Sequence, residues 1–173
     1  PFKPEAGKLE RLGVELLDED ALPPSAFPLV LALPPRQREE ARALLAKACA
    51  ACAPGGIVIA AVPNDEGAKS READLERLAG DLVVQSKHHC RAFHAMPGAT
   101  FDMALVDSWK SQDAVRRIAS EDVPGGGFRT RPGVFAWDRV DAASKLLASH
   151  LPAGLHGRVA DFGAGWGYLA LQV

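Results

Sequence analysis

The chain has 173 residues, of which 47% are hydrophobic and 24% charged, and its formal net charge is −2. This composition is close to that of soluble globular proteins, so it excludes collagen-like and wholly disordered chains. The slight acidity also argues against a strongly basic nucleic-acid binder. Any contact with nucleic acid must therefore depend on local basic clusters.

Membrane and secretion signals are missing from the sequence. No apolar run approaches the roughly 18 to 20 residues that cross a bilayer, and the polar start is not a signal peptide. Three cysteines are too few for a disulfide framework, which predicts a reducing, cytoplasmic setting without membrane contact. The chain begins with Pro1 and stops at Val173 inside an expected structural element, so we interpret it as a fragment at both ends.

The first hundred residues predict alternating strands and helices. Short continuous apolar runs indicate strands buried on both faces, as in a parallel sheet, and apolar residues at helical spacing indicate helices. The resulting order, strand–helix–strand–helix–strand–strand, is typical of an α/β fold. The expected elements are a strand at 29–33, a helix containing Ala41 to Cys52, a strand at 57–62, a helix over 71–79 stopped by Gly80, and strands at 82–84 and 90–95.

A second unit is expected after a flexible boundary at Pro124 to Gly127. The pattern predicts a connecting helix over 108–119 before this boundary and a helix over about 139–150 after it. A strand at 158–162 follows and runs into a glycine-rich turn, and a further helix should begin near Trp166.

The strongest motif of the chain is this strand, turn and helix start. It reads Asp161-Phe162-Gly163-Ala164-Gly165-Trp166-Gly167. Glycines let a ligand lie directly against the main chain, and a helix N-terminus offers unpaired N–H groups. Asp161 ends the strand and places a carboxylate where the ammonium group of a ligand can sit. A glycine turn that holds no ligand is the alternative.

The spacing of these glycines distinguishes between two kinds of nucleotide site. A dinucleotide fingerprint reads G-x-G-x-x-G, whereas this motif reads D-x-G-x-G-x-G. The motif resembles motif I of class I S-adenosylmethionine-dependent methyltransferases. A nicotinamide-dependent oxidoreductase is the less favoured interpretation.

The segment before the motif extends the resemblance. Phe128 to Asp141 reads FRTRPGVFAWDRVD and resembles the PGVFSWDRxD stretch of the small methyltransferase domain family, which includes bacterial 16S ribosomal RNA guanine-N2 methyltransferases. The resemblance implies that the cofactor S-adenosyl-L-methionine lies against two sets of residues. The first is the floor, Asp161, Gly163, Gly165 and Gly167, and the second is the wall, Phe128, Pro132, Gly133 and Phe135. An ordinary β-turn at Pro132-Gly133 and a core role for Phe135 and Trp137 remain open.

The resemblance also covers the first unit and implies the fold class. It indicates an α/β, Rossmann-like methyltransferase fold, with a degenerate N-terminal domain at 1–100, a linker with a helix at 101–127, and the truncated start of a catalytic, cofactor-binding domain at 128–173. Leu33-Pro34-Pro35 stands where an active copy has Asn-Pro-Pro. Leucine cannot hydrogen-bond a target amino group, so we expect the first unit to be inert as a catalyst. The catalytic residues are expected beyond Val173.

The expected function is therefore that of a fragment, itself inactive, of an S-adenosylmethionine-dependent enzyme that methylates guanine N2 of 16S ribosomal RNA. The expected partner is ribosomal RNA or the small ribosomal subunit, and the sequence does not indicate an oligomeric state. A non-catalytic module for RNA binding or folding is the alternative. The basic residues expected to contact RNA phosphates are Lys87, His88, Arg91, Arg129 and Arg131, although a solvated strand end explains the first three equally well.

Other motifs are weaker. Cys49 and Cys52 form a C-x-x-C pair, but at the C-terminal end of a helix, where the dipole opposes a thiolate. Nothing fixes a tetrahedral zinc site between this pair and the histidines of 88–94, so we expect no metal. Gly67-Ala68-Lys69-Ser70 lacks the spacing of a phosphate-binding loop.

Residues 158–173 supply only one strand, so we expect them to be disordered, to pack on the first unit or to pair with another chain.

Overall fold

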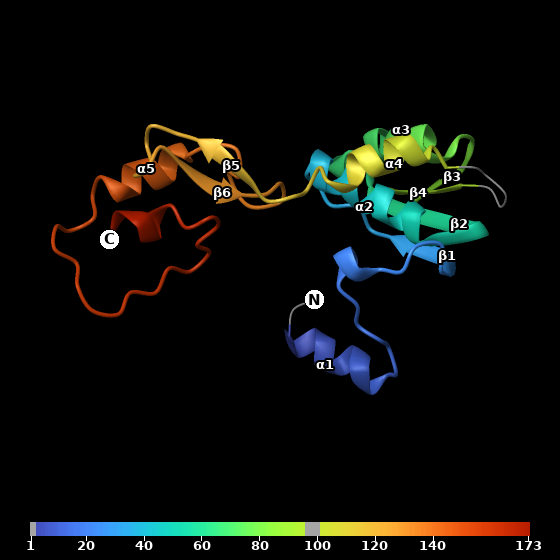
Figure 1. Cartoon of the computed structure of the whole chain (residues 1–173), viewed down its shortest axis with the longest axis horizontal. Coiled ribbons are helices and arrows are strands. Elements are labelled where there is room, and N and C mark those ends of the chain that lie inside the picture. Colours follow the sequence, from blue (N-terminus) through green and yellow to red (C-terminus); the bar gives the residue numbers. More distant parts are fainter. Residues whose placement is uncertain (1–2, 96–100) are drawn as a thin grey trace.

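A four-stranded mixed sheet with helices on one face forms the first part of the chain (Figure 1). The computed structural model describes residues 3–95 and 101–173. The strand order is β1-β2-β4-β3, with β1 parallel to β2 and the other two pairs antiparallel. The bounds are β1 (Phe27–Ala32), α2 (Arg38–Ala51), β2 (Cys52–Pro63), α3 (Ala68–Ala79), β3 (Leu82–Lys87), β4 (Cys90–Ala95) and α4 (Met103–Lys110). The predicted order of strands and helices over 27–95 is confirmed.

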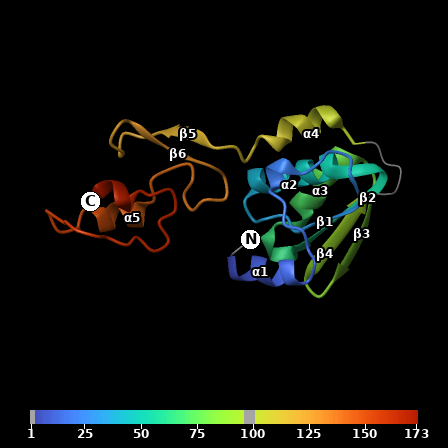
Figure 2. The same cartoon turned by 60° about the horizontal axis from the view of Figure 1, so that its bottom comes forward.

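The core of this part lies between the sheet and helices α2, α3 and α4 (Figure 2). Alternate residues of β2 and β4 point toward the helices, and Val58, Val62 and Phe93 are fully buried there. Trp109 of α4 closes the same core. Helix α4 therefore packs with the first hundred residues, while the predicted domain boundaries stay a prediction.

A buried carboxylate fixes the start of α2. Asp74 of α3 is 1% exposed and accepts hydrogen bonds from Arg38 at 3.1 and 3.2 Å and from Arg42 at 3.0 Å. Arg71, one helical turn earlier, donates to the carbonyl oxygens of Pro35 and Arg36. The Gln37 side chain caps α2 by accepting from the N–H of Glu40 at 2.7 Å. The loop after β1 is thus held by side chains from α3.

The expectation that the first strand is buried on both faces is wrong. Strand β1 lies at the edge of the sheet, and Leu29 and Leu31 are 51% and 72% exposed. Their cross-strand neighbours Ile57 and Ile59 are only partly buried. The reason is that, among the described residues, the helices packed in the core lie on the opposite face.

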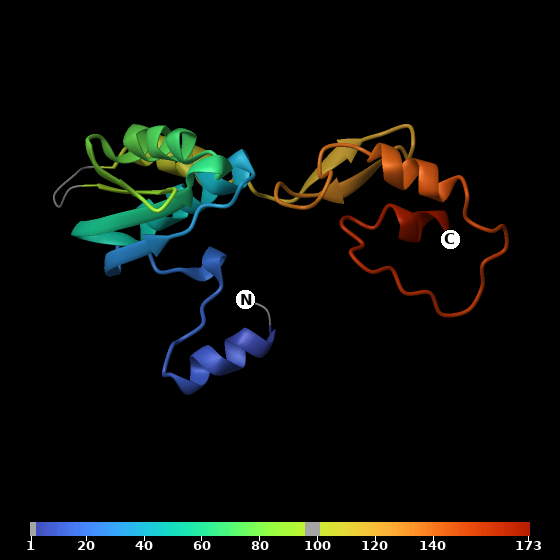
Figure 3. The same ribbon diagram turned by 180° about the vertical axis from the view of Figure 1, so that it is seen from behind.

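The second part of the chain is a two-stranded hairpin followed by a short helix and loops (Figures 1 and 3). Val123, Phe128 and Tyr168 form its small buried core. Its bounds are β5 (Arg116–Ala119), β6 (Gly127–Thr130), α5 (Ala142–Ala148) and the 3-10 helix η3 (Leu169–Gln172). At the other end of the chain, α1 (Lys3–Arg11) stands apart from the sheet, and the 3-10 helices η1 (Glu19–Ala21) and η2 (Asn64–Glu66) are single turns.

Three predicted elements of this second part are corrected. The helix expected over 108–119 ends at Lys110, because residues 116–119 pair with 127–130 as a hairpin. Residues 158–162 form no strand, since no strand among the described residues offers them backbone partners. The helix expected from Trp166 is a turn followed by η3. The end of this segment, Trp166, Tyr168 and Leu169, packs on the hairpin and α5, and not on the first part of the chain, which was one of the three expected outcomes.

Candidate cofactor site

The glycine-rich turn has a backbone that requires glycine. Gly163, Gly165 and Gly167 have φ values of 76°, 58° and 93°, in the left-handed region that other residues rarely adopt. No atom lies within 4 Å of a Cβ built on Gly163 or Gly167. These two glycines are therefore set by backbone conformation, and the space beside them is open.

A cavity of about 120 Å³ adjoins this turn. It takes in the predicted residues Asp161, Gly163, Gly165 and Phe135 together with Asp141 and Ser144 of the start of α5. The cavity is small compared with typical ligand pockets of about 300 to 1,000 Å³. A larger cavity of about 480 Å³ shares Asp161 with it.

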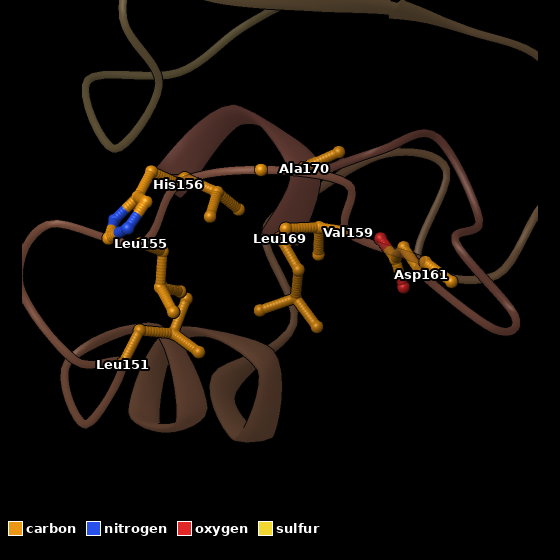
Figure 4. Close-up of a pocket in the computed structure, with 10 residues that line it drawn as sticks. Leu151, Leu155, His156, Val159, Asp161, Leu169 and Ala170 are labelled. Atoms are coloured by element: carbon orange, nitrogen blue, oxygen red, sulfur yellow. The ribbon is translucent and has the colours of Figure 1, made fainter.

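The larger cavity is mainly apolar (Figure 4). Leu151 and Leu155 approach it from the segment that follows α5, and Leu169 comes from η3. His156 and Asp161 supply the polar groups at opposite ends. An apolar space with few polar groups is typical of small-molecule sites.

Asp161 is the chemically distinctive residue. Its Oδ2 atom is buried and has no hydrogen-bond partner among the described residues. A buried carboxylate oxygen without a partner is costly, and such groups are rare in folded proteins. A ligand that brings a hydrogen-bond donor or a cation can therefore satisfy Asp161.

The other carboxylate of the site is already satisfied. Asp141 accepts hydrogen bonds from the backbone N–H of Ser144 at 2.9 Å and from its hydroxyl at 3.2 Å, and so caps α5. The backbone hydrogen bond in particular holds the pKa of Asp141 below its ordinary value of 3.8. The two carboxylates therefore have different roles: Asp141 supports the helix, and Asp161 remains available.

An aromatic stack fixes the turn to the hairpin. Phe128 of β6 stacks on Trp166 with ring centroids 3.6 Å apart, and Trp166 meets Tyr168 edge-on at 5.5 Å. Sequence reasoning missed Trp166, which stands between two of the motif glycines, and it missed Asp141. The D-x-x-S spacing of Asp141 and Ser144, an N-capping pattern, was the available signal for the latter.

The predicted wall residues are only partly brought together. Phe135 lines the small cavity and is 69% exposed, whereas Phe128 lies under Trp166 in the core. Pro132 is fully buried, and Gly133 faces Glu40 of α2 instead of the cavity. The roles of Phe128, Pro132 and Gly133 at a cofactor stay predictions.

The predicted RNA-contacting residues lie in two separate places. Lys87 and His88 are exposed at the turn between β3 and β4, and Arg129 and Arg131 are exposed on or next to β6 (Figure 2). Arg91 pairs with Glu72 at 2.5 Å. The hydrogen bond from Lys47 lowers the pKa of Asp20, and the charges of Lys47 and of Arg131 lower it further.

The cysteine pair offers no reactive group. Cys49 and Cys52 are both buried, and burial raises the pKa of Cys49 to about 12. In the part of the chain that the structure describes, no three metal-binding side chains are grouped to hold an ion. Within the same residues, no helix has the length and apolar character needed to cross a membrane.

Comparison with known families identifies the class. Residues 125–173, which hold the hairpin strand β6, the capped helix and the glycine turn, match the family described as Methyltransferase small domain. For this segment, the resemblance to the small methyltransferase domain family that was noted in the sequence is confirmed.

Individual relatives extend the match over most of the chain. The chain is 32% identical over 160 residues to the ribosomal RNA small subunit methyltransferase C of Shewanella sp. (strain W3-18-1). This alignment covers 91% of the chain and 44% of the relative. The protein of the same name from Psychromonas ingrahamii is 28% identical over 148 residues, covering 85% of this chain and 41% of the relative. The chain thus spans less than half the length of these relatives.

A solved structure shares the fold. The T. thermophilus 16S rRNA N2 G1207 methyltransferase, determined with AdoMet and guanosine, superposes with a TM-score of 0.59 at 22% identity. The match covers 82% of this chain and 38% of the other. The predicted α/β, methyltransferase-like fold class is confirmed.

Proposed function

We propose that this chain holds S-adenosylmethionine at the turn from Asp161 to Gly167, as part of an RNA methyltransferase. The observation that carries the proposal is the buried, unpartnered Oδ2 of Asp161 beside three glycines in the left-handed conformation. The ammonium group of the cofactor's methionine moiety would supply the missing donor. The open main chain of the turn would let the ligand approach without meeting a Cβ.

The substrate in this proposal is the exocyclic amino group at guanine N2 of 16S ribosomal RNA. It is supported by the names of the relatives and by that of the T. thermophilus enzyme with the same fold. S-adenosylmethionine supplies an electrophilic sulfonium methyl, so alignment is the main task left to the protein. Both Pro-Pro pairs of the chain follow leucine, Leu22 and Leu33, and we assign no residue here as the group that orients the amino group.

For RNA contact we propose the exposed basic residues Lys87, His88, Arg129 and Arg131. Arg91 contributes less, because Glu72 already neutralises it. A substrate of this kind also favours a cytoplasmic location. Replacing Lys87 and Arg129 by glutamine is expected to weaken RNA binding. Each substitution should also reduce the slope of log affinity against log salt concentration by about 1, the effect of losing one phosphate contact.

Calorimetric titration of the chain with S-adenosylmethionine, with NAD and with a 16S RNA hairpin tests the proposal. We expect a saturable heat of binding with S-adenosylmethionine and no binding of NAD. NAD binding with a flat S-adenosylmethionine trace would overturn it. RNA binding without any cofactor response would instead favour a non-catalytic RNA-binding module.

Asp161→Asn gives the sharper version of this experiment. Removing the charge should weaken S-adenosylmethionine binding by about tenfold or more, because an ammonium–carboxylate pair is lost. It should leave the stability of the free chain unchanged or higher, because the buried Oδ2 oxygen has no hydrogen-bond partner to lose. Asp65→Asn, at an exposed aspartate of η2, is the matched control and should change neither.

A further inference from the structure

Two neighbouring glutamates at the start of α2 reach across to the second part of the chain. Glu39 forms an ion pair with Arg116, the first residue of β5. The Arg116 guanidinium in turn lies over the ring of Trp137, 4.3 Å from its centroid. A continuous series of contacts therefore runs from the first turn of α2, through β5, to the loop that precedes α5.

Glu40 makes the second contact with the same loop. A Cβ built on Gly133 would lie 2.5 Å from the carboxylate carbon of Glu40, so a larger residue at this position would have to displace the Glu40 side chain. Gly133 also has a φ of 94°, which favours glycine independently. An open cavity of about 430 Å³, lined by Arg36, Gln37, Glu40, Gly133 and Val134, adjoins this contact.

The loop held in this way borders the candidate cofactor site. Phe135 and Ala136 line the small cavity beside Asp161. The carbonyl oxygen of Phe135 is 3.8 Å from where a Cβ on Gly165 would be. Ala136 has a φ of 47°, a strained value for a residue with a side chain, which persists only where the surroundings enforce it.

The contacts are too exposed to act mainly through stability. The side chains of Glu39 and Arg116 are 38% and 40% exposed, and ion pairs of this kind add little to folding. Their geometry is nevertheless specific, since one guanidinium meets both a carboxylate and an aromatic face. Orientation of the loop is the effect that such a contact can have.

We infer that Glu39 and Glu40 are positioning residues that hold the 133–137 loop against the glycine turn, so that the first part of the chain shapes the cofactor site of the second. The inference rests on the proposed function for the identity of the ligand. The geometry of the loop itself does not depend on that identity, which allows the two to be tested separately.

The experiment uses the whole chain and two readouts. Three tryptophans give three indole N–H signals in a nitrogen-15 NMR spectrum, and Trp137→Phe identifies the one of interest. Calorimetry with S-adenosylmethionine gives the dissociation constant. The variants are Glu39→Gln and Arg116→Gln, which break the contact, Arg116→Lys, which keeps the charge, and Glu76→Gln on the exposed side of α3 as the control.

Glu39→Gln and Arg116→Gln are expected to shift the Trp137 signal without ligand and to weaken binding about fivefold, the effect of losing one modest interaction. Arg116→Lys keeps the charge, so its Trp137 signal and its affinity should stay close to those of the wild type. Glu76→Gln should change neither. An unchanged Trp137 signal in Glu39→Gln overturns the inference. So does weaker binding that is accompanied by lost hydrogen-exchange protection of β5 and β6, because the role is then structural.

A wild-type chain that fails to bind S-adenosylmethionine refutes the proposed function alone. In that case the Trp137 signal decides the positioning of the loop: a shift in Glu39→Gln supports it, and no shift overturns it.

Discussion

Phe128 and Trp166 stack with their ring planes only 9° apart, although 38 positions separate them along the sequence (166 minus 128). One ring comes from the hairpin and the other from the glycine turn. Because Trp166 lies between Gly165 and Gly167, this stack fixes the turn on the hairpin. The order of the candidate site therefore depends on a contact outside the cavity.

Phe128→Ala is expected to destabilise the second part of the chain. Phe128 is 5% exposed, and truncating a buried phenylalanine costs about 3 kcal/mol or more. The free energy of opening measured by hydrogen exchange at the β6 amides should fall by that amount, or their protection should be lost altogether, while β2 keeps its protection. Phe162→Ala is the control, since Phe162 is 97% exposed and its loss should cost about 0.5 kcal/mol or less. Equal effects of the two substitutions would contradict this account.

Asp74→Ala is expected to destabilise the first part. The carboxylate is 1% exposed and neutralises Arg38 and Arg42, whose side chains are 53% and 21% exposed. Its removal takes away their charged hydrogen bonds, each worth about 1.5 to 3 kcal/mol when buried and less at the exposed Arg38. Urea unfolding followed by circular dichroism measures the loss, and Asp81→Ala, at an exposed site, should behave like the wild type. A wild-type urea midpoint for Asp74→Ala would show that the cluster adds no stability.

The three cysteines should differ strongly in reactivity. Cys90 is exposed, whereas burial raises the pKa of Cys49 to about 12 and also raises that of Cys52. A thiol reagent at pH 8 should label Cys90 quickly and the other two only as fast as the chain opens. Cys90→Ser should remove the fast phase. Rapid labelling of Cys49, or a Cys49–Cys52 disulfide seen by mass spectrometry, would contradict this prediction and indicate a redox-active pair.

Local patterns were sufficient to place the strands and helices of the central sheet along the chain. Strands at 82–84 and 90–95 and the helix stopped by Gly80 follow from side-chain periodicity and from a glycine that adopts a φ of 80°. The glycine turn was also predictable, because its residues need conformations that few others adopt. These features depend on neighbours in sequence.

Features that depend on distant segments were not predictable. A continuous apolar run such as 29–33 does not reveal which face of its strand is covered, and here Leu31 is exposed. Residues 116–119 resemble a helix end until 127–130 pairs with them. The strand expected at 158–162 needs partner strands that the described residues do not supply. The contact between Glu40 and Gly133 likewise joins segments more than ninety residues apart (133 minus 40).

The start of α5 should be sensitive to acid. Hydrogen bonds from the backbone and hydroxyl of Ser144 lower the pKa of Asp141 in the folded chain below 3.8. A lowered folded pKa means that this group stabilises the fold above pH 3.8, and that its contribution is lost as the pH falls through the folded value. An NMR titration of the Ser144 amide between pH 6 and pH 2 should show the cap releasing below pH 3.8. Asp141→Asn keeps a capping oxygen but cannot titrate, so its Ser144 signal should stay constant. If both chains titrate alike, the cap is not the acid-sensitive group.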